Sequence, residues 1–230
     1  MLPHVVAWSS VVEPGALPTR VLPDGCLDII WQAGRVFVAG PDTTAQAPSR
    51  PPVGTRFFAL RFGSGTGPGV LGLPASELTD RQVPLDALWP AAAVRRLAEA
   101  ADPPAALEAV AAARWREPDR AMVALAEAAR AGESVAGFAD RAGLSARHLQ
   151  RRANAAFGYA PKTLHRVFRL QRAVALARDG EPFARVAADA GYADQAHLAR
   201  EVRALAGVPL GELVRPGSRL HEGSLVRAPA

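Results

Sequence analysis

The segment "LSARHLQRRANAAFGYAPKTLHR" (residues 144–166) decides how the carboxy-terminal half of the chain folds. Ser145 is a residue type that caps helices, and Gly158 followed by Pro161 is typical of one helix ending and another beginning. The segment lies inside residues 141–178, which contain nine Arg or Lys residues and no acid. A solvated helix face normally mixes charge signs, so this stretch predicts a surface that faces a polyanion, with a chance charge cluster as the alternative.

The same pattern recurs 48 to 49 residues further along the chain. In each copy a short helix with an apolar face ends at a glycine, and a second helix then starts at a capping residue. The matched residues, first copy before second, are Val135 and Phe183, Phe138 and Val186, Gly143 and Gly191, Ser145 and Asp194, Leu149 and Leu198, Arg151 and Arg200, and Gly158 and Gly207. A helix, a tight glycine turn and a second helix form a helix-turn-helix unit, and two copies in register indicate it far more strongly than one.

Between the copies, "PKTLHRVFRLQRAVALARDG" (161–180) predicts a longer helix that begins at Pro161 and ends near Gly180. Its buried side consists of Leu164, Val167, Phe168 and Val174. We expect this helix to hold the two units rigidly apart. If both second helices enter major grooves on one face of a DNA duplex, they lie about 34 Å apart, which is one turn of B-DNA.

Residues 119–214 resemble the DNA-binding domain of AraC/XylS-type transcription regulators. The segments that carry the resemblance are "FADRAGLSARHLQRRANAAFGYAP", "RLQRAVALA" and "VAADAGYADQAHLAREVRALAGVPL". It implies seven helices, with two helix-turn-helix units joined by a linker helix, and double-stranded promoter or operator DNA as the partner. The sequence departs from the family pattern at His165, where a Tyr is common, at Ala199 and Glu201, which flank Arg200, and at Val202, where an aromatic residue is usual.

The outward side of each predicted recognition helix supplies candidate DNA contacts. Arginine can bridge O6 and N7 of guanine, and glutamine can pair with N6 and N7 of adenine. We predict base contacts, with a phosphate contact as the alternative for each, from Arg147, Gln150, Arg151, Gln195, His197 and Arg200. Neighbouring cations that add affinity without reading sequence are Arg152, Lys162, Arg166, Arg169 and Arg203.

The amino-terminal half shows strand-like patterns where the carboxy-terminal half shows helical ones. Its first 70 or so residues are short runs of Val, Ile, Phe and Trp between Pro and Gly turns, and helical patterns begin near Pro74. We therefore expect an α+β protein: a small β-rich domain with trailing helices, then an all-α domain of two helix-turn-helix units joined by a linker helix. The expected limits are 1–117 for a sensing domain, 118–215 for the DNA-binding domain and 216–230 for a flexible tail. Residues 1–118 carry 10 basic and 11 acidic residues, whereas residues 119–215 carry 15 and 10.

Two segments, "LPDGCLDIIWQAGRVFVAGPDT" (22–43) and "VLGLPASELTDRQVPLDALW" (70–89), resemble the amino-terminal domain of a subset of bacterial AraC-type regulators. In that family the domain senses a ligand or drives dimerisation. The candidate sensor residues are Asp24, Cys26, Asp28 and Trp31. One interpretation makes Cys26 a redox sensor or ligand contact; the other makes it a small buried residue, with Asp24 capping a turn.

Burial of Asp28 would require an ion-pair partner, for which Arg35 and Arg61 are the candidates. The amino-terminal aromatic residues are most simply core residues, and lining an apolar effector pocket is the alternative. They are Trp8, Trp31, Phe57 and Phe58.

Several classes of function are disfavoured. The histidines show no H-E-x-x-H spacing, and the chain has no G-x-S-x-G and no Walker sequence; "GSGTGPG" (63–69) lacks the Lys-Ser/Thr ending of a phosphate loop. We therefore predict no enzyme activity, metal or cofactor. The single cysteine cannot form an internal disulfide, and no signal peptide or membrane span is recognisable, which favours a cytoplasmic protein without membrane contact.

The resulting hypothesis is a sequence-specific transcription regulator that responds to an unidentified small-molecule effector. RNA polymerase and a second copy of the chain, as a homodimer, are further partners that this hypothesis admits. One alternative is a regulator that acts mainly through protein–protein contact and has a weakened second DNA-binding motif. The other is an alkyl acceptor or sensor based on Cys26.

Overall fold

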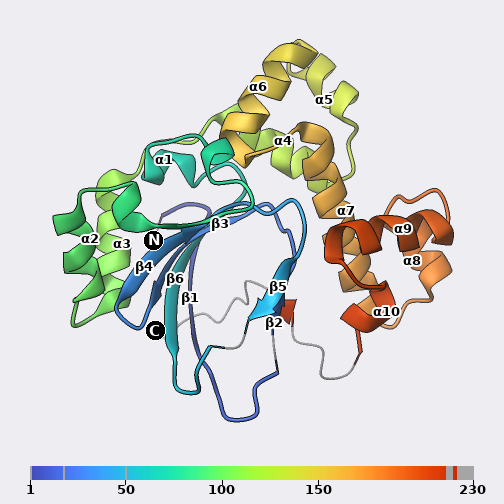
Figure 1. The fold of residues 1–230 in the computed structure, drawn as a ribbon. Helices are drawn as coiled ribbons and strands as arrows, with labels where there is room; N and C mark the ends of the chain where they lie inside the picture. Colours follow the sequence, from blue (N-terminus) through green and yellow to red (C-terminus); the bar gives the residue numbers. More distant parts are fainter. Residues whose placement is uncertain (1, 18, 50, 216–219, 222–230) are drawn as a thin grey trace.

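The computed structural model describes residues 2–17, 19–49, 51–215 and 220–221 of the chain. A β-rich amino-terminal part is followed by helices, and a helical carboxy-terminal part lies beside it (Figure 1). The α+β architecture is therefore confirmed. Of the tail predicted at 216–230, only Leu220 and His221 are described, and the rest lies outside the described residues.

The amino-terminal part is built on a five-stranded antiparallel sheet with the strand order β1-β6-β3-β4-β7. Its strands are β1 (Val5–Val11), β3 (Leu27–Gln32), β4 (Arg35–Ala39), β6 (Arg56–Phe62) and β7 (Gln82–Pro84). Alternate residues point to one face, where Ile29, Val38 and Leu60 are buried beneath α2 (Ala91–Ala98) and α3 (Pro103–Arg114). The opposite face carries Asp28 and Arg61, which are paired across β3 and β6.

Short helical turns connect the sheet to these helices: α1 (Pro68–Leu71) and the 3-10 turns η1 (Ala75–Glu77) and η2 (Leu85–Ala87). A second, three-stranded sheet has the order β5-β2-β8, formed by β5 (Gln46–Ser49), β2 (Thr19–Val21) and β8 (Leu220–His221). It reaches toward the helical part, because Leu22 at the end of β2 is buried in the core of the second helix-turn-helix unit.

The carboxy-terminal part contains the seven helices that the family resemblance implies, counted over the described residues. They are α4 (Arg120–Arg130), α5 (Val135–Arg141), α6 (Ala146–Phe157), α7 (Pro161–Arg178), α8 (Phe183–Asp189), α9 (Gln195–Ala206) and α10 (Leu210–Leu213). The turns of the two units contain Gly143 and Gly191, whose φ angles of 63° and 81° favour glycine. The predicted units, α5–α6 and α8–α9, are confirmed.

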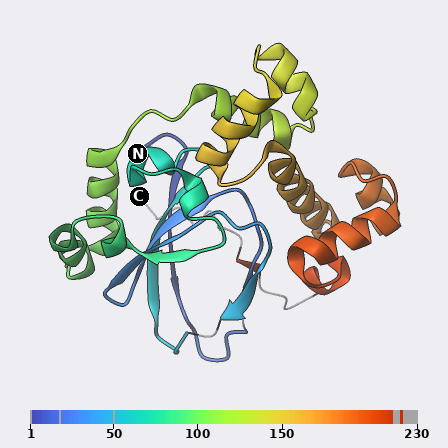
Figure 2. The same cartoon turned by 45° about the horizontal axis from the view of Figure 1, so that its top comes forward.

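Each unit has its own hydrophobic core, and α7 contributes to both. Leu164 and Phe168 pack with α4, α5 and α6, whereas Leu170 and Val174 pack with α8, α9 and α10. Figure 2 shows α7, in brown, running between the yellow first unit and the orange second unit. The predicted linker between the units is therefore one helix, whose first half packs in the core of the first unit and whose second half packs in the core of the second. No helix in the described part of the chain combines the length and apolar character that a membrane span requires.

Candidate nucleic-acid interface

The first recognition helix, α6, is fixed from its amino-terminal end. The Oγ of Ser145 accepts a hydrogen bond from the backbone nitrogen of His148 at 3.3 Å, as a helix cap does. Leu149 is buried in the core of the first unit. The three predicted base-reading side chains of this helix are all exposed: Arg147, Gln150 and Arg151.

The second recognition helix, α9, repeats this arrangement. Asp194 Oδ1 accepts a hydrogen bond from the backbone nitrogen of His197 at 2.6 Å. Gln195 and Arg200 are exposed, but His197 is half-buried. The Nδ1 of His197 accepts a hydrogen bond from the backbone nitrogen of Ala193, and its ring stands edge-on to Tyr192 at 5.4 Å. His197 therefore closes the turn of the unit, and only its Nε2 is left for a DNA contact.

A basic groove of about 580 Å³ lies between the two units. It is bounded by Val135 at the start of α5 and by Gly191 in the turn of the second unit. Its floor is one face of α7, with Lys162, the adjacent pair His165 and Arg166, and then Arg169 and Arg172 at successive turns. The structure thus gathers Lys162, Arg166 and Arg169, which were predicted to contact phosphates, into one surface.

An acidic side chain of the same domain, Glu201, neutralises part of the positive charge of this groove. Glu201 on α9 accepts two hydrogen bonds from Arg166, at 2.8 and 3.3 Å, and lies 3.8 Å from Arg169. The guanidinium of Arg169 also lies 5.0 Å above the ring of Tyr192. Hydrogen bonding and attraction from Arg166 hold the pKa of Glu201 below its usual value, so Glu201 is ionised at neutral pH. Burial, reinforced by Arg169, lowers the pKa of His165, which adds no charge to the groove at that pH.

Arg152 has a structural partner that the sequence did not reveal. Its guanidinium forms a two-pronged ion pair with Asp119, the capping residue of α4, with Nε and Oδ2 2.7 Å apart. The hydrogen bonds from Arg152 lower the pKa of Asp119. This pair ties α6 to α4, whereas Arg203, the remaining predicted phosphate ligand, is exposed.

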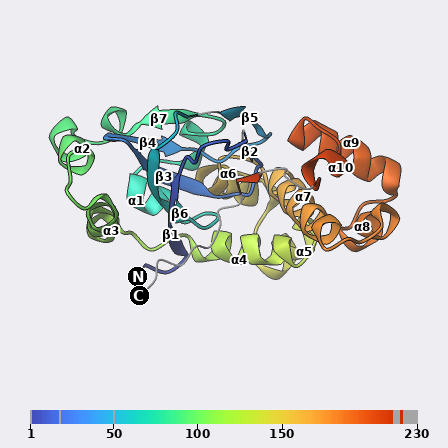
Figure 3. The same ribbon diagram turned by 90° about the horizontal axis from the view of Figure 1, so that it is seen from below.

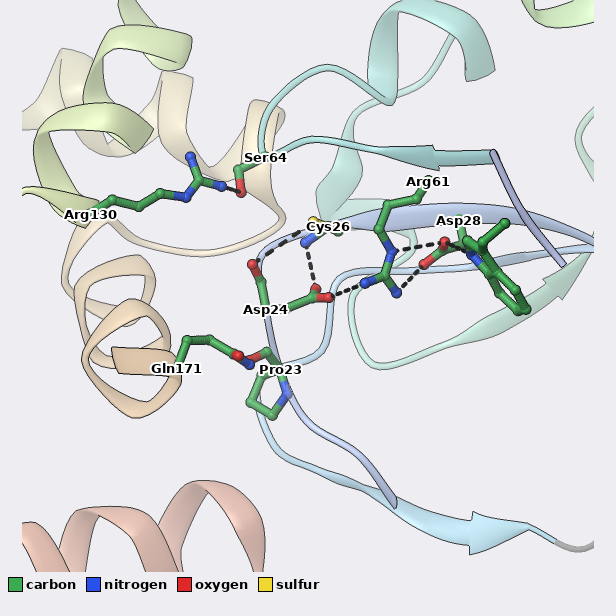
Figure 4. A network of polar contacts seen from close by, with 9 residues as sticks. Pro23, Asp24, Cys26, Asp28, Arg61, Ser64, Arg130 and Gln171 are labelled. Atoms are coloured by element: carbon green, nitrogen blue, oxygen red, sulfur yellow. Dashed lines mark hydrogen bonds and ion pairs between the residues drawn. The ribbon is translucent and has the colours of Figure 1, made fainter. Parts of the chain in front are cut away.

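Two of the candidate sensor residues, Asp24 and Asp28, form an ion-pair cluster with Arg61 (Figure 4). Arg61 contacts Asp24 at 2.7 Å and Asp28 at 3.0 Å, and Trp8 Nε1 donates to Asp28 at 3.0 Å. Asp24 Oδ1 also accepts a hydrogen bond from the backbone nitrogen of Cys26, which makes it a turn cap. Arg61, and not the exposed Arg35, is therefore the partner of the buried Asp28.

Cys26 and Trp31 occupy different environments. Burial raises the pKa of the Cys26 thiol well above its usual value, and the neighbouring Asp24 raises it further, so the thiol stays protonated at neutral pH. Trp31 lies on the other face of the sheet, where its Nε1 donates to the carbonyl of Ala98 and its ring packs on Phe58 at 5.6 Å. Trp31 is half-buried and packs against the core of the sheet, and the four candidates do not converge on one site.

Two of the acids that organise this interface, Asp119 and Glu201, were not predicted. Asp119 is separated from Arg152 by 33 residues, and Glu201 from Arg166 by 35. No local spacing rule covers pairs of that separation. The one available signal was that Glu201 departs from the family pattern on a helix expected to face an anion.

Comparison with known proteins adds two family matches. Residues 138–215 match a model described as a helix-turn-helix domain, and residues 4–84 match a domain of unknown function, DUF6597. A search of curated proteins finds no match.

Among solved structures, a 1.65 Å structure of ToxT from Vibrio cholerae is similar, with 9% identity, a TM-score of 0.49, and coverage of 91% of this chain and 98% of that one. Wild-type ToxT of Vibrio cholerae strain SCE256 with bound unsaturated fatty acid has 10% identity and a TM-score of 0.48, with 94% and 96% covered.

The family match at residues 138–215 covers α5 from Phe138 onward and all of α6, α7, α8, α9 and α10. The two units, offset by 48 to 49 residues, lie within the segments that carry the resemblance to AraC-type regulators. Residues 138–215 of this chain therefore form a helix-turn-helix domain of the AraC type, which supports a role in DNA binding and transcription regulation.

Proposed function

We propose that the regulator reads two successive major grooves of one operator, with α6 in the first and α9 in the second. The observation that carries this proposal is the equivalence of the two helices. Each starts at a side-chain cap, ends at a left-handed glycine and presents an exposed arginine at the matched position, Arg151 or Arg200. Because α7 packs in both cores, one helix connects the two units directly.

The structure also supports a division of labour among the cations. Exposed side chains on the recognition helices supply base contacts: Arg147, Gln150, Arg151, Gln195 and Arg200, with His197 through its Nε2. The exposed cations Lys162 and Arg203 supply phosphate contacts, together with Arg166 and Arg169 in the groove. Arg152, held by Asp119, acts mainly by positioning α6.

We further propose that the amino-terminal domain, taken as residues 1–117, regulates the DNA-binding domain at 118–215 in response to an effector. Support comes from hydrogen bonds that join the two parts, such as Arg130 Nη2 to Ser64 Oγ at 2.9 Å and Gln171 Nε2 to the carbonyl of Pro23 at 2.6 Å. A change in the β-rich domain therefore has a direct route to α4 and α7. The protonated state of Cys26 favours a structural role over an alkyl-acceptor role for this residue.

The test starts by enriching bound duplexes from a random-sequence library with the full-length protein. Arg151→Ala is expected to weaken binding to the enriched duplex by about 1–3 kcal/mol, because it removes one good base contact, and to change binding to random DNA little. The exposed Arg96 on α2 provides the control variant, Arg96→Ala, which should bind both DNAs normally.

Salt dependence separates this proposal from a regulator that acts mainly through protein contact. Log K for the enriched duplex should fall with log salt with a slope of about −0.9 for each phosphate contacted. A flat salt dependence, or an equal loss on both DNAs for Arg151→Ala, would contradict the proposal.

A further inference from the structure

Both recognition helices end against the amino-terminal domain, close to the glycines that stop them. At the end of α6, Thr79 Oγ1 donates a hydrogen bond to the carbonyl of Gly158 at 2.8 Å. At the end of α9, Arg20 Nη1 donates to the carbonyl of Ala206 at 3.1 Å, and the backbone nitrogen of Ala45 donates to the carbonyl of Leu205 at 2.7 Å. The contacted residues lie at or just before the glycine that stops each helix.

These carbonyls are groups that a helix leaves without an intrahelical partner. The last four carbonyls of an α-helix have no amide of the same helix to accept from, so an outside donor can bind them without breaking the helix. Thr79 follows η1, and Arg20 lies in β2, so the two donors come from different regions of the amino-terminal domain. Each donor therefore holds one recognition helix by its carboxy-terminal end.

Packing at the end of α6 is close. Gly158 adopts a left-handed conformation with φ of 82°, and a Cβ atom placed there would lie 2.8 Å from Cγ of Pro41 and 3.2 Å from the carbonyl oxygen of Ala75. The end of α6 thus packs directly against Pro41 and against the backbone of Ala75, four residues before Thr79. At Gly207 a Cβ atom would meet only Nη1 of Arg20 at 3.6 Å, so α9 is held there mainly by the arginine side chain.

A third contact connects the two ends through the linker helix. The loop at Pro23 accepts the hydrogen bond of Gln171, and the adjoining Leu22 is buried in the core of the second unit. Asp24 follows directly and is anchored to Arg61 on β6, as Figure 4 shows. Figure 3 shows the sheet lying alongside α6 and α7, with β2 close to the second unit. The amino-terminal domain thus touches the first recognition helix, the linker and the second recognition helix.

We propose that Thr79 and Arg20 are positioning residues through which the amino-terminal domain sets the separation of the two recognition helices. This inference rests on the proposed two-groove function. The linker helix is flanked by short segments at Gly158–Ala160 and Asp179–Pro182, where the backbone can change direction. The two hydrogen bonds from outside remove that freedom. The separation of half-sites that the regulator accepts is therefore a property of the whole chain, and not of the helix-turn-helix domain alone.

The separation can be measured without DNA, by pulsed electron resonance between two spin labels on the full-length protein. Ala155 on α6 and Ala204 on α9 are both exposed and lie 49 residues apart, so they are equivalent sites for labelling as cysteines in a Cys26→Ser background. We expect one narrow distance distribution in this parent. Thr79→Ala combined with Arg20→Ala should broaden it, and Thr79→Ser, which keeps the hydroxyl donor, should not.

Matched controls come from the same domain. Thr55 Oγ1 donates to the carbonyl of Pro52 at 2.6 Å, and Arg81 Nη1 donates to the carbonyl of Glu77 at 3.0 Å, so both bonds stay within the amino-terminal domain. Thr55→Ala combined with Arg81→Ala should leave the distance distribution narrow. An unchanged distribution in the folded Thr79→Ala, Arg20→Ala protein would overturn the inference, as would equal broadening in the control.

The consequence for recognition is tested on enriched duplexes in which the two half-sites are moved apart or together by one to five base pairs. The parent should bind the original spacing best. In the Thr79→Ala, Arg20→Ala protein the preference should fall by about fivefold to a hundredfold, the range for loss of two hydrogen bonds, with binding to a single half-site unchanged. An equal loss at every spacing would contradict the inference. If the enriched duplexes contain only one half-site, the proposed two-groove function is wrong. If the Thr79→Ala, Arg20→Ala protein still shows a broadened spin-label distance distribution in that case, the positioning role of Thr79 and Arg20 is nevertheless supported.

Discussion

The two helix-turn-helix units share one backbone design but differ in the charge that they leave for DNA. The first recognition helix, α6, carries three arginines and no acid, whereas α9 carries two arginines and Glu201. In the first unit the structural acid, Asp119, lies outside the recognition helix and holds only Arg152. In the second, Glu201 lies within the helix and draws Arg166 and Arg169 of the linker toward it.

The difference shows that one arginine side chain can either hold two helices together or bind a DNA phosphate. A carboxylate on α9 fixes that helix to α7, but each guanidinium that it holds is less available to a phosphate. In the first unit Arg147 and Arg151 are exposed. The unit is held in place by close packing of the end of α6 against the amino-terminal domain. We therefore expect the first unit to supply most of the binding energy and the second to add spacing and specificity.

The largest expected effect contrasts the glycines that stop the two recognition helices. Gly158→Ala introduces a left-handed alanine, about 1–2 kcal/mol, and crowds Pro41 and the carbonyl of Ala75, about 1–3 kcal/mol more. Gly207→Ala meets only the movable side chain of Arg20, so the backbone penalty alone applies. Urea unfolding should show a larger loss of unfolding free energy for Gly158→Ala. Equal losses of unfolding free energy in the two variants would mean that the close packing at the end of α6 does not distinguish the two units.

A smaller effect is expected from Glu201→Gln, which releases Arg166 and Arg169. Binding to random DNA should tighten, and the salt slope should steepen by about 0.9 for each arginine that gains a phosphate. Glu212→Gln removes the same charge from the exposed face of α10 and is the matched control. Anisotropy titrations at several salt concentrations measure both quantities. A steeper slope in the control alone, or in neither variant, would contradict the assigned role of Glu201.

The smallest effect is the acid titration of the same pair. Because Arg166 lowers the pKa of Glu201 below its usual 4.5, the stabilisation from this pair is present above about pH 4.5 and is lost as pH falls through the folded-state pKa. The pair is partly exposed, so the contribution is at most about 1 kcal/mol. Unfolding free energy measured between pH 3 and pH 6 should fall less steeply toward acid in Glu201→Gln than in the parent.

Much of the fold followed from local patterns. The apolar spacing, the caps Ser145 and Asp194, and the stops Gly158 and Gly207 act over a few residues, and each was predicted correctly. The strand-rich start and the partnership of Asp28 with an arginine could also be anticipated, because a buried carboxylate requires a cation. The choice of Arg61 over Arg35 depended on the register of β3 against β6, which the sequence does not display.

What escaped prediction is the set of contacts between distant segments. Thr79 and Gly158 are 79 residues apart, and Arg20 and Ala206 are 186 apart, so no periodicity links them. The same holds for the anchoring of Arg152 by Asp119, 33 residues away. The hydrogen bond by which His197 closes a turn is local, four residues from Ala193, but helical spacing alone does not indicate it. The exposure of Arg147, Arg151 and Arg200 could be predicted because the outward face of a helix can be read from the positions of its buried leucines.

Hydroxyl-radical footprinting on the enriched duplex tests the two-groove claim most directly. Full-length protein should protect two patches on one face of the duplex, about one helical turn apart. Arg200→Ala should lose the weaker patch and keep the other, whereas Arg151→Ala should lose both, because the first unit supplies most of the binding. A single patch that is unchanged by Arg200→Ala would contradict the account.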